Sequence, residues 1–123
     1  YENYIHVAPE ERKRLLDAIA AEGISGVVFL TGDRHHTEMS KYKPAGGFPV
    51  YDLTVSPFTS GTYPGDGDAN KLLIPGTEYV GHNFATLDVS GPRLDRKVLI
   101  TVKNHLGVQI WQQEISGKEM LQK

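Results

Sequence analysis

Residues 27–40, "VVFLTGDRHHTEMS", place four consecutive apolar residues directly before a Gly-Asp turn and two adjacent histidines. A continuous apolar run such as Val27–Leu30 is typical of a strand that is covered on both faces. Gly32 is expected to end this strand. Asp33 and His35 then follow its carboxyl end, where ligand sites form in α/β sheets. The stretch therefore predicts a buried strand and a candidate site.

The segment before this strand predicts a helix over residues 9–22. Pro9 suits the first helical turn, and the two glutamates after it favour the positive end of the helix dipole. Gly23 is well suited to end the helix. Three apolar residues recur at helical spacing and form one face: Leu15, Leu16 and Ile19.

The rest of the chain predicts mainly β-structure. Further strands are expected over residues 37–42, 50–55, 84–89, 97–103 and 108–115. The last two should form a hairpin about "NHLG". Residues 58–78 are rich in Gly, Pro, Asp and Thr, which predicts a long loop of the kind that is usually functional or mobile. One helix followed by strands indicates a single α/β domain, α+β by content, which suits 123 residues.

Composition excludes some classes of function. The net charge of -2 and the lack of a basic stripe argue against a nucleic-acid patch. Without cysteine there is neither a disulfide nor a thiolate metal site. No apolar run is long enough for a membrane segment, and no signal peptide is visible. Because the chain opens "YENYIHVAPEE" without Met, we expect it to be a piece of a longer protein.

Asp33 and His35 are the first candidates for chemistry. A D-x-H pair in a tight turn offers a carboxylate oxygen and an imidazole, which together suit zinc, iron or manganese, while the oxygen also suits calcium. The structural alternative is that Asp33 caps the turn and the histidines are solvated. The pair alone does not decide between a metal site and a turn.

Three further polar residues are candidates for a second shell or a substrate rim. His36 could hydrogen-bond a phosphate or a carboxylate behind the metal ligands. Neighbours on an extended chain face opposite sides, so we expect it to point away from His35. His82 and Asn83 begin a predicted strand after the long loop and could line the mouth of a site, or they could simply be polar turn residues.

The loop sequence "PGDGDAN" holds a third candidate, Asp66 and Asp68. Alternating acids in a Gly-rich loop can bind calcium. The later glutamate of an EF-hand loop is absent here, so a solvated turn is the expected structure.

Four segments, in order, carry a family resemblance. They are "ERKRLLDAIA" at 11–20, "GDRH" at 32–35, "YDLTVSPFT" at 51–59 and "HNFATLDV" at 82–89. The opening "YENY" is similar to the approach to such a helix. The chain thereby resembles the PhoD-like alkaline phosphatases and phosphodiesterases, a branch of the calcineurin-like metallophosphoesterases, over most of its length.

This resemblance implies the C-terminal half of a metallophosphoesterase-type β-sandwich with a flanking helix. It also implies a two-metal site that holds a phosphate ester and activates a hydroxide. Asp33 and His35 match the family's last metal-binding turn and would be ligands, whereas Arg34 occupies a variable position. Calcium and iron are the expected ions, with zinc or manganese as alternatives.

The departures from the family pattern are equally informative. Its earlier ligand motifs, of the kinds D-x-H, G-D-x-x-D and G-N-H-[DE], are missing, and "GDGDAN" is similar only superficially and follows the GDRH turn. We therefore expect the C-terminal part of a larger enzyme. Alone it should be inactive, bind metal weakly or partially, and self-associate through the surface left by its missing half. The sequence itself does not locate the protein, but the family resemblance implies an exported or periplasmic parent.

Two alternatives remain open from sequence. The chain could be a self-contained, non-catalytic binding or structural domain in which GDRH is only a turn. It could also form an active enzyme assembled from two chains.

Overall fold

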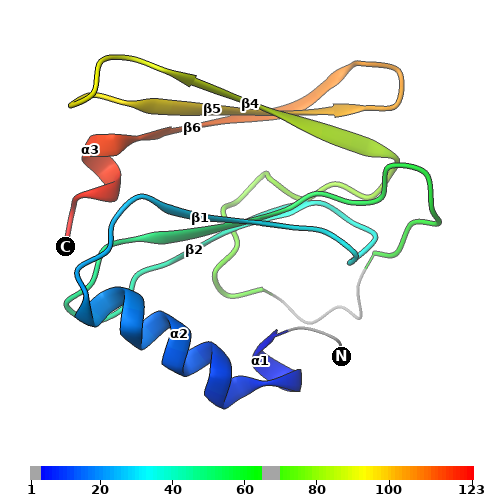
Figure 1. Cartoon of the computed structure of the whole chain (residues 1–123). Helices are drawn as coiled ribbons and strands as arrows, with labels where there is room; N and C mark the ends of the chain where they lie inside the picture. The colour runs from blue at the N-terminus through cyan, green and yellow to red at the C-terminus, as the bar shows by residue number, and fades with distance from the viewer. Residues whose placement is uncertain (1–3, 65–69) are drawn as a thin grey trace.

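The chain folds into two three-stranded sheets packed face to face, with one helix on the outer face of the first sheet (Figure 1). The computed structural model describes residues 4–64 and 70–123. The elements in order are α1 (Tyr4–Val7), α2 (Pro9–Ala21), β1 (Val27–Thr31), β2 (Glu38–Tyr42), β3 (Val50–Thr54), β4 (Asn83–Ser90), β5 (Lys97–Asn104), β6 (Gln109–Ser116) and α3 (Gly117–Met120). The predicted α+β content, a helix followed by strands, is confirmed.

Helix α2 has local signals at both ends, and they explain its position. It begins at Pro9, with two glutamates in its first turn, and Gly23 lies just past its end at φ 63°. Its buried residues Leu16 and Ile19 pack on Val50 of β3. Neither α1 nor α3, each a single turn, was predicted from the sequence.

The first sheet has the order β1-β3-β2, with β1 parallel and β2 antiparallel to the central β3. The outer edge of β2 is covered by the long loop between β3 and β4. The amide of Lys41 donates to the carbonyl of Leu72, and the amide of Ile74 donates to the carbonyl of Met39. An isolated bridge between Thr37 and residue 79 continues this cover. The long loop is thus partly ordered as an edge for the sheet.

The second sheet is an antiparallel meander of order β4-β5-β6. Its β5–β6 hairpin turns at residues 105–108, where the Asn104 side chain accepts hydrogen bonds from the amides of Leu106 and Val108. The main core lies between the sheets and consists of Met39, Tyr51, Leu53, Ile100, Val102, Trp111, Ile115 and Met120.

The prediction that β1 is covered on both faces is wrong for its far end. Val27, Val28 and Phe29 are half-buried, but Leu30 is 63% exposed. The cause is position: β1 is the edge strand of its sheet and pairs only with β3 among the described residues. The apolar sequence of β1 indicates a strand with two buried faces. The described residues do not bury all of it, and Leu30 is left exposed.

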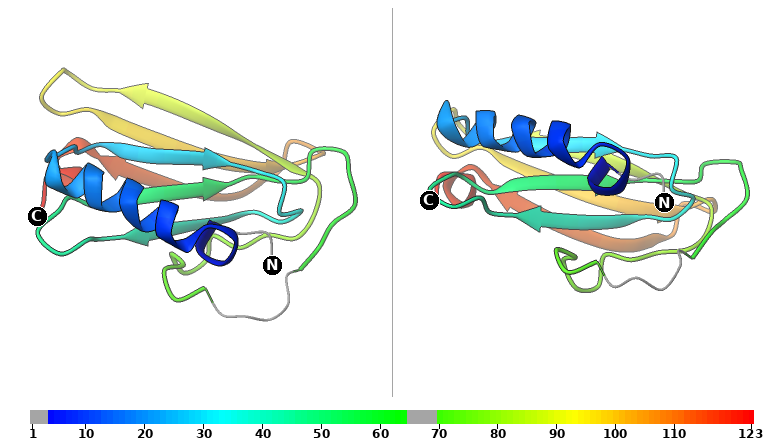
Figure 2. Two further views of the ribbon diagram at one scale, coloured as in Figure 1. Left: turned by 60° about the horizontal axis from the view of Figure 1, so that its bottom comes forward. Right: turned by 90° about the horizontal axis from the view of Figure 1, so that it is seen from below.

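Strand β4 is exposed along the same side of the sandwich (Figure 2). Leu87 and Val89 share a face with Ala85, which packs on the main core, yet they are 40% and 66% exposed. Leu30 likewise shares a face with the core residue Val28. Within residues 4–64 and 70–123, no segment covers this side, which we call the open side. No helix among these residues has the length and hydropathy to span a membrane.

Candidate functional site

The GDRH turn follows directly from the end of β1, as predicted. Asp33 and His35 both have left-handed backbone conformations, with φ 68° and φ 61°. The amide of Arg34 donates to the carbonyl of Gly32 at 2.8 Å, which closes a tight three-residue turn about Asp33. Left-handed residues other than glycine are uncommon and carry a conformational cost of roughly 1–3 kcal/mol each. Two of them in three positions require support from the surrounding structure.

That support comes first from Ser56, which is buried just after β3. The amide of His35 donates to Ser56 Oγ at 2.7 Å. On the other side, the amide of Tyr63 donates to the His35 carbonyl at 2.9 Å. The backbone of His35 is thus held through both of its polar groups, while Asp33 lies exposed at the surface.

A buried polar network fixes Ser56 in turn. The hydroxyl of Thr37 accepts a hydrogen bond from the Ser56 amide at 3.2 Å and donates one to Asn83 Oδ1 at 2.7 Å. Asn83 Nδ2 donates to the carbonyls of Ser56 and Gly81, at 2.9 and 2.8 Å. Thr37 is fully buried and Asn83 is 2% exposed. The network therefore joins the GDRH turn, the end of β3 and the start of β4.

This geometry places Asn83 behind the turn rather than at its mouth. Its amide oxygen and both of its amide hydrogens have protein partners, so it is engaged in holding the backbone. Sequence reasoning named Asn83 but assigned no role to Thr37, which follows the candidate His36, and missed Ser56. Ser56 lies inside the matched segment "YDLTVSPFT" and Thr37 lies two residues after GDRH, but short polar residues at strand ends are common everywhere and do not mark a site by themselves.

His36 is buried and lies against the side of the turn. Its Nδ1 is 3.0 Å from the Arg34 carbonyl, and its Nε2 is 3.6 Å from a carboxylate oxygen of Glu38. The Arg34 guanidinium lies 3.8 Å from the other oxygen of Glu38. A carboxylate therefore lies beside His36, contributed by the first residue of β2, but at 3.6 Å it is beyond hydrogen-bonding distance, so the second-shell role of His36 stays a prediction.

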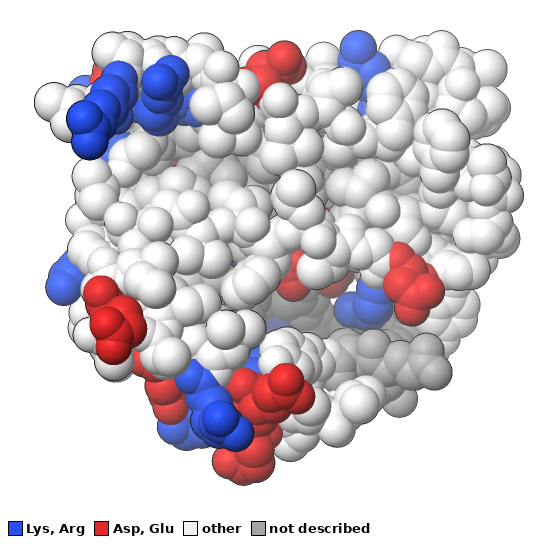
Figure 3. All heavy atoms as spheres, in the orientation of Figure 1, with Lys and Arg blue, Asp and Glu red and all other residues white. Residues whose placement is uncertain are grey.

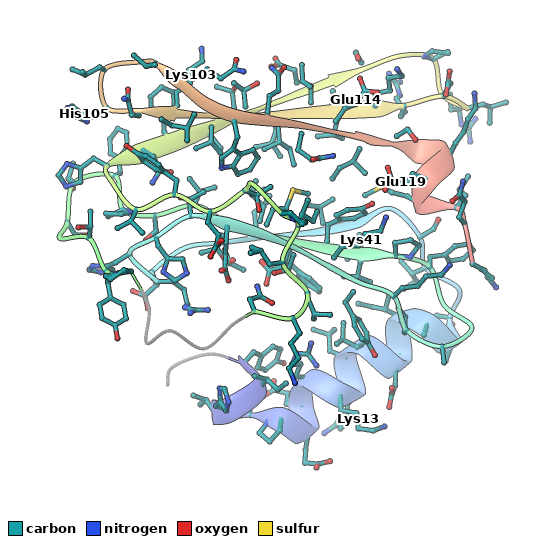
Figure 4. All side chains as sticks on the ribbon, turned by 180° about the vertical axis from the view of Figure 1, so that it is seen from behind. Lys13, Lys41, Lys103, His105, Glu114 and Glu119 are labelled. Atoms are coloured by element: carbon teal, nitrogen blue, oxygen red, sulfur yellow. The ribbon has the colours of Figure 1, made fainter. Side chains whose placement is uncertain are left out.

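His82 is exposed, and its ring lies near the β5–β6 hairpin. Its Nε2 is 2.9 Å from the Ser60 carbonyl. Its ring meets that of His105 edge to face, with centroids 6.2 Å apart, and Figure 4 shows His105 at that end of the sandwich. This pairing could not be predicted from two histidines so distant in sequence. The candidates Asp66 and Asp68 lie outside the described residues.

Comparison with known families gives one result. The family model of the PhoD-like phosphatases matches residues 3–88, which is more than half of the chain. The chain belongs to the PhoD-like phosphatase family. The matched region runs through the GDRH turn and into β4, so it contains every member of the network described above. Searches of curated proteins and of solved structures found no match.

PhoD-like phosphatases are generally metal-dependent, which raises the question of whether the residues present fit a metal. Asp33 and His35 offer suitable donor types. However, the described part of the chain contains no group of three or more His, Asp or Glu that could hold an ion, whereas catalytic zinc centres, for example, use three protein ligands. The described residues alone do not fit a complete metal centre. That Asp33 and His35 reach a common ion stays a prediction.

A hollow of about 370 Å³ opens beside the turn, between α2 and the outer face of the first sheet. Gly32 and Asp33 form part of its rim, and Asp52 of β3 is in its lining. Figure 3 shows acidic and basic side chains gathered where this face of the molecule is hollowed. Burial raises the pKa of Asp52, against the opposing effect of a hydrogen bond from the Thr31 hydroxyl at 2.8 Å. Sequence reasoning missed Asp52, whose signal was a single acid inside an otherwise apolar strand.

Proposed function

We propose that this chain is the C-terminal part of a metal-dependent phosphatase or phosphodiesterase of the calcineurin-like type. Asp33 and His35 would be one pair of its metal ligands. The observation that carries the proposal is the GDRH turn itself: in a PhoD-like phosphatase, two potential ligands follow a strand end in conformations that are costly without support.

The hydrogen-bond network that holds the GDRH turn supports a functional role for this turn. In a turn that serves only to reverse the chain, glycine at either left-handed position would remove the conformational cost, because glycine adopts positive φ readily. Here the cost is offset by the Ser56 hydroxyl and by the buried pair behind it, Thr37 and Asn83. Strain that surrounding structure maintains is characteristic of functional sites. It supports a role for the turn in positioning its side chains.

Metal ions in phosphoesterases stabilise charge on the phosphoryl group and lower the pKa of bound water. Calcium and iron are the ions we propose for the parent enzyme, with zinc or manganese as alternatives, and a phosphate ester as its substrate. This chain would contribute one carboxylate and one imidazole. The further ligands and the groups that act on the ester would come from outside the described residues.

Paramagnetic broadening by Mn²⁺ tests the ligand assignment directly. In a ¹⁵N–¹H correlation spectrum, small additions of Mn²⁺ should broaden the amides of residues 32–36 before others. Asp33→Ala and His35→Ala should each reduce that broadening. The matched controls, Asp88→Ala on β4 and His105→Ala in the β5–β6 hairpin, should leave it unchanged. Broadening centred elsewhere, or unaffected by both GDRH variants, would remove the metal assignment while leaving the family membership intact.

A further inference from the structure

The proposal above uses only the rim of the hollow beside α2, where Asp33 lies, and gives no role to its interior. Its floor is the outer face of the first sheet, where Phe29, Val50 and Asp52 line it. One wall is α2, represented by Leu15 and Leu16. The described chain thus forms a partly enclosed site that is mainly apolar, with one carboxyl on its floor. Its volume of about 370 Å³ lies within the usual range for small-ligand sites, roughly 300–1,000 Å³.

Asp52 is the charged group in this hollow that most needs a partner. It is half-buried, and its carboxylate accepts a hydrogen bond from the Thr31 hydroxyl. Among the described residues, no cationic nitrogen lies within 4.0 Å of it. A carboxylate has about four acceptor positions, so most of its capacity is unused.

The two arginines that line the hollow have contacts elsewhere. The guanidinium of Arg12 lies over the ring of Tyr42, 5.7 Å from its centroid, and that of Arg34 is 3.8 Å from a Glu38 oxygen. They lower the pKa of Asp52 from a distance but do not outweigh its burial. An added hydrogen-bond donor with positive charge would supply what the carboxylate lacks.

We propose that this hollow binds a small organic ammonium ion. The ammonium group would donate to Asp52, and the apolar body of the ligand would pack on Phe29 and against Leu16 of α2. An anion would instead meet two half-buried arginines that already have contacts elsewhere, with an under-partnered carboxylate on the floor, and a neutral ligand would leave that carboxylate without a charged partner. The site requires no metal, so it stands apart from the proposed phosphoesterase function.

Benzylamine is a suitable probe, with benzyl alcohol and benzoate as its neutral and anionic counterparts. Titration of the ¹⁵N-labelled chain at neutral pH should shift the amides of Phe29, Thr31 and Asp52 with benzylamine alone. Asp52→Asn keeps the shape and the Thr31 hydrogen bond but removes the charge. It should weaken benzylamine binding about tenfold or more, as expected for a charge-assisted hydrogen bond. The control Asp88→Asn, on the other sheet, should bind normally.

A second variant tests the same site in case Asp52→Asn perturbs the fold. Leu15→Trp alters an exposed wall residue and should abolish binding by filling the hollow while Asp52 remains. The proposal is overturned if benzyl alcohol binds as well as benzylamine, if Asp52→Asn binds undiminished, or if Leu15→Trp has no effect. Preferential binding of benzoate that depends on Arg12 would identify an anion site instead.

Discussion

At the residue scale, the feature that matters most is a fully buried amide with no spare hydrogen-bonding group. Asn83 joins three segments of the chain through its contacts with the Thr37 hydroxyl and with the carbonyls of Ser56 and Gly81. Leaving such groups unsatisfied costs more than forming their hydrogen bonds gains. The conformation of the GDRH turn therefore depends on a residue that does not belong to it.

Asn83→Ala should lower the free energy of unfolding by about 2–4 kcal/mol, because it removes three buried hydrogen bonds, those to the Thr37 hydroxyl and to the carbonyls of Ser56 and Gly81. Urea unfolding measures this loss. Asn104→Ala is the control, since that side chain accepts two backbone hydrogen bonds but lies in an accessible hairpin. It should cost about 1 kcal/mol. Equal losses for both variants would mean that the network behind the turn is not specially stabilising.

The place of this turn could be predicted from sequence, but its conformation and support could not. A strand followed by Gly-Asp is a local pattern, so Asp33 and His35 were correctly placed at a strand end. Their left-handed conformations depend on Ser56, which is 21 residues from His35 in the chain. Asp52 illustrates the same limit, because its position in the hollow depends on the packing of α2.

At the element scale, α2 and the hairpin were predictable because their ends carry local signals. Pro9 and Gly23 bracket the helix, and the turn after Asn104 closes the hairpin. The burial of β1 was not predictable from its own residues. Its neighbours, not its sequence, determine that Leu30 is exposed.

Helix α3 joins the two sheets through one carboxylate. Glu119 Oε1 lies 2.6 Å from Lys41 Nζ of β2 and 2.6 Å from the hydroxyl of Tyr51 of β3, and Figure 4 shows Lys41 and Glu119 facing each other across the layers. The hydrogen bonds from Lys41 and Tyr51 lower the pKa of Glu119. A lowered pKa means that this contribution to stability is present above the unfolded-state pKa and is lost as the pH falls through the folded-state pKa.

Glu119→Gln should therefore destabilise the chain at neutral pH, by about 0.5–1 kcal/mol because the pair is partly exposed. The difference from the unmodified chain should shrink in acid, as the pH falls below the ordinary glutamate pKa of 4.5. Thermal unfolding across a pH series measures it. Glu114→Gln, which removes the partner of Lys97 within the second sheet, should have a smaller effect. A Glu119→Gln difference that does not change with pH would contradict the assignment.

At the scale of the whole molecule, the open side suggests an interaction with a second copy. Leu30, Leu87 and Val89 face the core without being covered by described residues. Unpaired edges and contiguous apolar surface favour association. We expect light scattering across a dilution series to detect self-association. Val89→Lys should reduce it, and Leu106→Lys at the exposed hairpin tip should not. A strict monomer at every concentration would favour a self-contained domain.

We also expect no substantial phosphatase activity from this chain alone. A catalytic metal pair draws its ligands from several strand ends, and the described residues offer only the GDRH turn. Assays with a chromogenic monoester and diester, supplied in turn with calcium, iron, zinc and manganese, measure this. Robust turnover that disappears in Asp33→Ala would show instead that the chain, or a pair of chains, assembles a complete site.

The loop that covers β2 has a consequence for how far association can proceed. Hydrogen bonds to Leu72 and from Ile74 already occupy the outer edge of β2, so the first sheet can gain a strand only beside β1. A sheet that accepts neighbours at both ends can polymerise, whereas one with a single accepting end is completed by its first neighbour. Two copies joined through β1 would form a six-stranded sheet terminated by a loop at each end. Growth through this sheet should therefore stop at a closed dimer rather than continue into a fibre.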